Sequence, residues 1–143
     1  MKLQQLSLFI ENRSGQVRIP CQALADAGIN ILAMSLADTE QFGILRLIVK
    51  DWQKARDLLE RAGSVVKITD VVAVEVEDHP GGLLKLLTIF ENAKMTIEYM
   101  YAFNTSGPGD RAVLVFRFDD PDAALRVLQQ HGVNALKSLE LPG

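Results

Sequence analysis

The chain repeats itself, and this repeat limits the possible folds more than any other feature of the sequence. When the second half is moved back by 66 positions, residues 77–81 (EDHPG) fall on residues 11–15 (ENRSG), and residues 93–97 fall on residues 27–31. Three extra residues around 106–108 shift the offset to 69, after which residues 116–132 align with residues 47–63. Two copies of one unit fill the chain. We place the first domain at residues 1–70 and the second at residues 71–143.

Each copy carries the same order of expected elements. Apolar residues alternate over residues 6–10 and again over 72–76, which predicts a half-buried strand. A turn follows, and residues 83–90 then place apolar side chains three and four positions apart, which predicts a helix packed on the strands. Each copy continues with two more strands, a second helix and a short fourth strand; the second strands are expected at residues 30–36 and 96–103, and the third at 43–49 and 111–118. The stretch 106–110 reads as a hairpin connection.

Helix-end signals support this reading. Asp51 and Asp120 stand where helix N-caps are expected, and Gly63 and Gly132 suit the left-handed position after a helix. Pro20 conflicts with a helix that starts directly after the first turn, because proline lacks the backbone N–H that a helix interior uses. We therefore expect this helix to begin nearer residue 19 or to be kinked there, so that the two turns differ.

The predicted fold class is α+β. The order β-α-β-β-α-β, present twice, is the ferredoxin-like arrangement, in which an antiparallel sheet carries helices on one face. Because this fold hosts many functions, the function must be argued from particular residues.

Composition narrows the classes of partner. Lysine and arginine total 15 against 18 acidic residues, and no basic block stands out, so nucleic-acid binding is not expected. No apolar run is long enough to cross a bilayer, so no membrane partner is expected. The only cysteine, Cys21, cannot form an internal disulfide, and no secretory leader opens the chain, which favours a cytoplasmic location.

Catalytic patterns are missing from the sequence. It contains no phosphate-binding Walker loop, no Ser-His-Asp signature and no carboxylate pair in a recognisable acid–base setting. Two histidines and one cysteine at unrelated positions do not predict a metal site. We therefore expect no enzyme activity, no cofactor and no metal.

The turn after the first strand of each copy has chemistry of its own. We call the turn that follows Glu11 the N-terminal elbow and the turn that follows Glu77 the C-terminal elbow. Each elbow precedes a helix N-terminus, where unpaired N–H groups and the helix dipole attract carboxylates. Glycine lets a ligand approach the backbone closely, and Asp78 could hold an ammonium group beside a bound carboxylate. An amino acid carries both groups.

The elbows resemble those of a known family. Residues 12–17 (NRSGQV) with 24–31 (LADAGINI), and residues 78–83 (DHPGGL), are similar to the ACT domain, a ligand-sensing module of amino-acid metabolism, and the two matches cover essentially the whole chain. The resemblance implies allosteric amino-acid binding between paired ACT domains, where the elbow of one domain and the early second strand of its neighbour hold the ligand. The residues it implies are Asn12, Arg13, Ser14, Gly15, Asn30 and Ile31 in the first copy and Asp78, His79, Pro80, Gly81, Gly82, Thr96 and Ile97 in the second.

Three departures from the family pattern leave the number of sites open. Ser14 stands in place of the common proline, Lys94 in place of the glycine that matches Gly28, and Thr96 in place of the asparagine that matches Asn30. One site per chain, a site formed only between chains, and two sites all remain open.

The sequence thus predicts a non-enzymatic regulator that binds a free amino acid or an analogue, pairs as a homodimer and acts on a metabolic enzyme. Met34, Met100 and Tyr101 would suit a ligand with an apolar or aromatic side chain. The alternative is a degenerate ACT pair that serves as a protein–protein interaction module and binds no small molecule.

Overall fold

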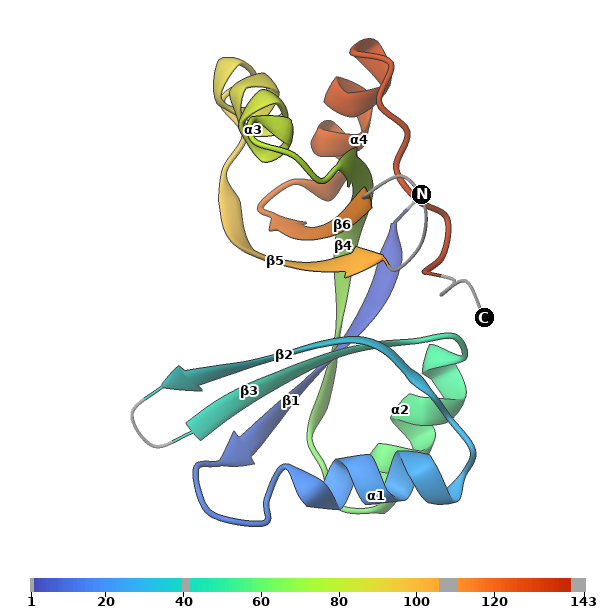
Figure 1. Ribbon diagram of the computed structural model, residues 1–143. Coiled ribbons are helices and arrows are strands. Elements are labelled where there is room, and N and C mark those ends of the chain that lie inside the picture. Colours follow the sequence, from blue (N-terminus) through green and yellow to red (C-terminus); the bar gives the residue numbers. More distant parts are fainter. Residues whose placement is uncertain (1, 40–41, 106–110, 140–143) are drawn as a thin grey trace. The chain divides into compact units, whose positions relative to one another are not determined.

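The structure of the protein is a computed structural model that describes residues 2–39, 42–105 and 111–139 (Figure 1). The expected hairpin connection at 106–110 lies outside the described residues. The chain forms two compact units: an N-terminal unit of Gln4–Thr69, and a C-terminal unit that runs from Asp70 onward and also includes Lys2 and Leu3.

The N-terminal unit contains β1 (Leu3–Glu11), α1 (Arg18–Asp26), β2 (Ile31–Thr39), β3 (Phe42–Val49), α2 (Trp52–Arg61) and the start of β4 (Val66–Glu77). Strand β3 pairs antiparallel with both β1 and β2. The hydroxyl oxygens of Ser7 and Thr69 lie 3.4 Å apart, which places the start of β4 beside β1. Helices α1 and α2 cover one face of these strands (Figure 1). The core between them is aliphatic and consists of Leu6, Leu8, Ile10, Leu24, Leu45, Leu47, Val49, Ala55 and Leu59.

The C-terminal unit repeats the pattern with the rest of β4, then α3 (Gly82–Asn92), β5 (Ile97–Thr105), β6 (Arg111–Phe118) and α4 (Pro121–Gln130). Strand β6 pairs antiparallel with β4 and β5. The core of this unit contains an aromatic cluster, in which the ring of Phe90 lies 5.3 Å from that of Phe116 and 4.8 Å from that of Phe118. Edge-to-face packing of this kind adds to the free energy gained from burial alone.

The predicted ferredoxin-like order is confirmed, with two differences. The fourth strand of the first copy and the first strand of the second are one continuous strand, β4, because residues 66–77 (VKITDVVAVEVE) contain no glycine or proline to end it. The expected last strand is reduced, within the described residues, to a bridge between Val74 and Ala135, beside which Leu136 N–H donates to the Ala73 carbonyl at 2.8 Å.

The predicted helix ends are confirmed. The Asp51 carboxylate accepts the N–H of Lys54 at 3.2 Å, and that of Asp120 accepts the N–H of Ala123 at 3.1 Å. Gly63 and Gly132 have φ of 95° and 70°. Helix α1 begins at Arg18, so Pro20 lies in the first turn, where a missing N–H leaves no hydrogen bond unmade.

Candidate functional site

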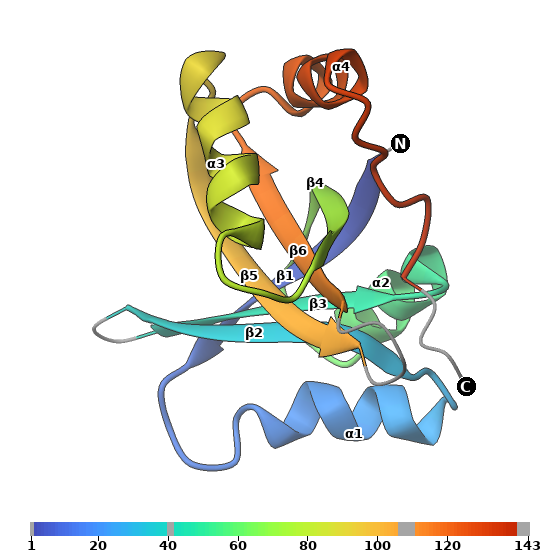
Figure 2. The same ribbon diagram turned by 45° about the horizontal axis from the view of Figure 1, so that its top comes forward.

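The two elbows differ in length. Helix α3 begins at Gly82, five residues after the last residue of β4, whereas α1 begins at Arg18, seven residues after the last residue of β1 (Figure 2). The position that matches Gly82 in the first copy is Gln16. A Cβ atom at Gly82 would collide with the backbone carbonyl oxygen of Glu77. Glutamine therefore cannot make the short turn, and the N-terminal elbow is longer.

Both elbows nevertheless contain a matching contact between a basic side chain and a carboxylate. Arg13 Nη2 lies 2.7 Å from the Glu11 carboxylate, and His79 Nε2 lies 2.8 Å from the Glu77 carboxylate. In each case a basic side chain two residues after the end of the strand contacts the last acidic side chain of that strand. The basic group of the first elbow is always charged, because a guanidinium does not lose its proton in proteins, whereas the imidazole of the second elbow can titrate.

Each elbow is also tied to the end of the second strand of its unit. Asn12 Nδ2 donates to Asp38 Oδ1 at 2.9 Å, and Asn104 Nδ2 donates to Asp78 Oδ2 at 2.8 Å. The two hydrogen bonds occupy matching positions, but the amide and the carboxylate have exchanged places. Sequence reasoning missed Asp38 and Asn104, although each lies 26 residues after its partner and the exchange of Asn and Asp is visible in the repeat.

His79 has an acceptor at each ring nitrogen. Its Nδ1 lies 2.9 Å from the Pro80 carbonyl oxygen, while Nε2 faces the Glu77 carboxylate. Both ring nitrogens can donate only in the imidazolium form. The Pro80 carbonyl, and after it the Glu77 carboxylate, raise the pKa of His79 above its usual value. The contacts of the C-terminal elbow therefore favour the imidazolium form of His79 over the neutral form.

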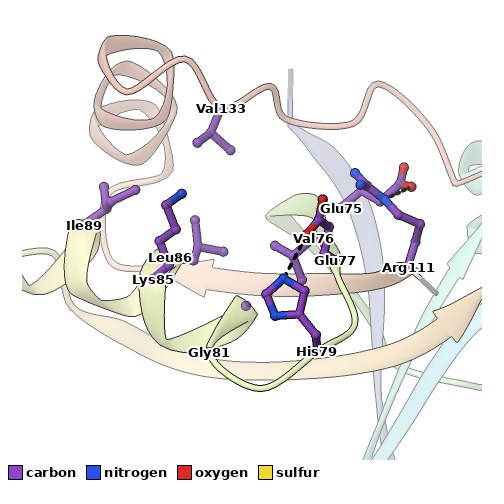
Figure 3. Close-up of a pocket in the computed structure, with 11 residues that line it drawn as sticks. Glu75, Val76, Glu77, His79, Gly81, Lys85, Leu86, Ile89, Arg111 and Val133 are labelled. Carbon is purple, nitrogen blue, oxygen red and sulfur yellow. Dashed lines mark hydrogen bonds and ion pairs between the residues drawn. The ribbon is translucent and has the colours of Figure 1, made fainter. Parts of the chain in front are cut away.

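A cavity of about 310 Å³ opens beside the C-terminal elbow (Figure 3). Its apolar wall comes from β4, α3 and the segment after α4, and its charged groups come from β4, β6, α3 and the elbow. Arg111 forms an ion pair with Glu75 at 2.8 Å, whereas Lys85 has no ion-pair partner among the residues that the structure describes. The lining residues are Glu75, Val76, Glu77, His79, Gly81, Gly82, Lys85, Leu86, Ile89, Arg111 and Val133.

Comparison with known proteins decides the family. The family model described as "ACT domain pair" matches residues 1–141. The chain belongs to the ACT domain pair family. No curated protein matches it significantly.

Several solved structures are similar to this ACT pair. Protein BT0572 from Bacteroides thetaiotaomicron is 38% identical, with 95% of this chain and 92% of that chain covered and a TM-score of 0.88. The regulatory subunit of aspartate kinase from Thermus thermophilus is 20% identical, with coverage of 89% and 91% and a TM-score of 0.63. That from Thermus flavus is 21% identical, with coverage of 89% and 90% and a TM-score of 0.60. At these identities the two Thermus subunits show the shared fold alone.

The residues that the ACT resemblance implies do not all come together within one unit. In the C-terminal unit His79, Gly81 and Gly82 line the cavity, Pro80 supplies a carbonyl to His79, and Asp78 is bonded to Asn104. Thr96 and Ile97 lie where β5 begins. Because β4 and β5 both run antiparallel to β6, the elbow lies near the end of β5 and away from its start.

The N-terminal unit shows the same separation. The tie between Asn12 and Asp38 places the elbow beside the end of β2, whereas Asn30 and Ile31 lie at its start. Arg13, Ser14 and Gly15 are in the elbow, and Gly15 has a left-handed φ of 86°, matched by 91° at Gly81. The ligand-binding role of all these residues stays a prediction.

Other kinds of site find no support in the described part of this ACT pair. Among residues 2–39, 42–105 and 111–139, no three His, Cys, Asp or Glu side chains gather where they could hold a metal ion. None of the helices in these ranges has the length and apolar character needed to span a membrane.

Proposed function

We propose that the protein is a non-catalytic regulator that binds a free amino acid, or a close analogue, at the C-terminal elbow. The observation that carries this proposal is the cavity, which combines an apolar wall with charged groups of both signs. Membership of the ACT domain pair family supports a regulatory role.

The chemistry of the cavity suits the two charged groups of an amino acid. Lys85 and the first N–H groups of α3 offer a place for the carboxylate, because both carry positive charge. Glu77 offers a place for the ammonium group. Val76, Leu86, Ile89 and Val133 offer contact to an apolar side chain. The volume of about 310 Å³ is at the small end of the range for ligand sites, which suits one amino acid.

The early second strands enter this proposal through a neighbouring ACT domain, which we place in a second copy of the chain. Thr96, Ile97, Asn30 and Ile31 can reach an elbow if a neighbouring ACT domain supplies them, as the ACT resemblance implies. Strand β2 carries exposed apolar side chains, with Met34 exposed to 47% and Leu36 to 54%. Exposed apolar side chains on a strand favour burial against another chain. We therefore propose a homodimer.

The regulated partner in this proposal is an enzyme of amino-acid metabolism. The two Thermus proteins with the same fold are named as regulatory subunits of aspartate kinase, and this chain aligns with 91% and 90% of their lengths.

A thermal-shift panel tests the proposal. Each standard amino acid is added at millimolar concentration, and a ligand that binds only the folded state raises the melting temperature. We expect a selective rise with an apolar amino acid. Lys85→Ala should abolish this rise, whereas Lys54→Ala, which removes a lysine from α2 in the other unit, should leave it unchanged.

The panel also decides between the two functions that the sequence leaves open. If no amino acid changes the melting temperature, the proposal is wrong and the protein-interaction module is favoured. Leu84, 66% exposed on α3, would then be the first residue to test for binding to a partner.

A further inference from the structure

The C-terminal elbow differs chemically from the N-terminal elbow because it has His79 where the other has Arg13. Its Nε2 and the Glu77 carboxylate are 2.8 Å apart, and both residues line the cavity in which we place the amino acid. In Figure 3 the imidazole ring points from the elbow toward Glu77. The carboxylate best placed to receive the ligand's ammonium group is therefore already occupied by the protein's own cation.

The surrounding charges show which groups act on this pair. Strand β4 contributes Glu75, whose charge is balanced by Arg111 of β6 at 2.8 Å. Helix α3 contributes Lys85, and the elbow itself contributes Asp78, which accepts a hydrogen bond from Asn104. The segment after α4 lines the cavity with Val133 and adds no charged side chain there. Glu77 is thus the carboxylate that depends on His79 for its partner.

We propose that the ammonium group of the bound amino acid replaces the proton between His79 Nε2 and Glu77, so that ligand binding expels one proton from the C-terminal elbow. This inference rests on the proposed function and specifies how that site is regulated.

The exchange balances in atoms and charge. The imidazolium loses its Nε2 proton to the solvent, and its Nδ1–H continues to donate to the Pro80 carbonyl. The ammonium group then donates one hydrogen bond to the freed lone pair of Nε2 and another to Glu77. Before binding, the pair consists of imidazolium and carboxylate; afterwards the ligand's ammonium has taken over the positive charge beside Glu77. The ligand's carboxylate, which we place at Lys85 and the α3 N-terminus, makes the occupied site one unit more negative, and this unit matches the proton released to the solvent.

The exchange is possible at only one of the two elbows. Arg13 makes the matching contact with Glu11 in the N-terminal elbow, but a guanidinium has no proton to lose at neutral pH and no lone pair to offer an ammonium group. The inference therefore assigns one amino-acid site to each chain.

Calorimetric titration with L-leucine, whose side chain suits the apolar wall, tests the inference. In buffers with different ionisation enthalpies, at a pH near about 6.5, the heat should reveal net proton release. The dissociation constant should fall by up to about tenfold per pH unit as the pH rises through the titration of His79. The control ligand 4-methylpentanoate has the carboxylate and side chain but no ammonium group, and it should show no release.

Two variants of His79 test whether its proton causes the proton release and the pH dependence of binding. His79→Arg copies the N-terminal elbow and should bind leucine weakly, without proton release and without pH dependence. His79→Gln removes the cation but can still accept a hydrogen bond, so it should bind leucine with the same affinity from about pH 6 to about pH 8.

The outcomes separate this inference from the proposed function. Leucine binding with no proton release, or with release that persists in His79→Gln, overturns the inference and leaves the proposed function standing. Failure of leucine to bind at either end of this pH range overturns the inference as stated. The amino-acid panel then decides independently whether the proposed function survives.

Discussion

The N-terminal and C-terminal elbows build similar contacts from different residues. Each has a carboxylate–cation pair at its base and an amide–carboxylate hydrogen bond to the end of the second strand. Yet arginine is exchanged for histidine, and the amide and the carboxylate change places. The comparison shows that the positions of these contacts follow from the shared β-α-β geometry, whereas their response to pH and to ligands depends on residue identity.

The lengths of the elbows add a second lesson. One side chain, present in Gln16 and absent in Gly82, decides where the helix can begin. The tight turn at Gly82 also brings the α3 N-terminus next to Glu77 and His79 at the wall of the cavity. The absence of a Cβ atom at Gly82 thus separates a turn that forms part of the cavity from one that is two residues longer.

The largest effect should come from Gly82→Ala. The new Cβ collides with the backbone carbonyl of Glu77, which cannot move aside as a flexible side chain would, and we expect the free energy of unfolding to fall by about 2–3 kcal/mol. The matched change Gln16→Ala should alter it by less than about 0.5 kcal/mol. Urea denaturation of both variants measures the difference, and equal losses would show that the elbows do not differ in this way.

A smaller effect on the free energy of unfolding is expected from changes just after the first helix of each copy, α1 and α3. Lys94 has a left-handed φ of 57°, and its counterpart Gly28 has a φ of 70°. Both N–H groups make the same 3.0 Å hydrogen bond to the carbonyl three residues earlier. Because a side chain is strained in this conformation, Lys94→Gly should raise the free energy of unfolding by about 1 kcal/mol, and Gly28→Lys should lower it by a similar amount. Changes of the same sign in both variants would contradict this account.

The hydrogen bond between Asn104 and Asp78 can be tested by exchanging its amide and its carboxylate between the two positions. Asn104→Asp places two carboxylates against each other and should destabilise the protein by about 0.5 kcal/mol, since the pair is exposed. Adding Asp78→Asn restores an amide–carboxylate pair in the orientation of the N-terminal elbow and should recover the loss. A double-mutant cycle measures the recovery, and additive losses would show that the two side chains do not interact.

The smallest effect is the pH dependence of the stabilisation that the contact between His79 and Glu77 provides. The folded protein raises the pKa of His79, so the stabilisation from this pair is fully present below the unfolded value of about 6.5 and is lost as the pH rises through the higher folded value. The ring resonances of His79, followed by NMR, should titrate at a lower pH in Glu77→Gln. An unchanged titration would show that Glu77 does not stabilise the imidazolium. Glu11→Gln should leave the titration of His79 unchanged.

Local signals made much of the fold predictable. Apolar periodicity located the helices, and Asp51, Asp120, Gly63 and Gly132 marked helix ends because capping depends on a few neighbouring residues. The repeat then allowed the elements predicted in one copy to be compared with those at the matching positions of the other. Phe116 and Phe118 align with Leu47 and Val49 in the repeat, and all four are core residues.

The candidate site was less predictable because strand register brings it together. Glu75 and Arg111 are 36 residues apart in sequence and meet through the pairing of β4 with β6. No local pattern reports such a register. The resemblance added Thr96 and Ile97 to the elbow, but within one unit they lie at the far end of α3. Family position alone does not say which chain supplies a residue.

The continuous strand β4 affects how the two copies can be recombined. Thr69 ends the N-terminal unit and Asp70 continues the C-terminal unit within the same strand, with no linker between them. At the other end of the chain, Lys2 forms ion pairs with Asp122 at 3.1 Å and Asp70 at 3.8 Å, inside the C-terminal unit. A gene cut between the copies would therefore encode a C-terminal unit without Lys2 and both of its ion pairs. Domain shuffling can move this duplication intact, but it cannot divide it at one peptide bond and keep both halves complete.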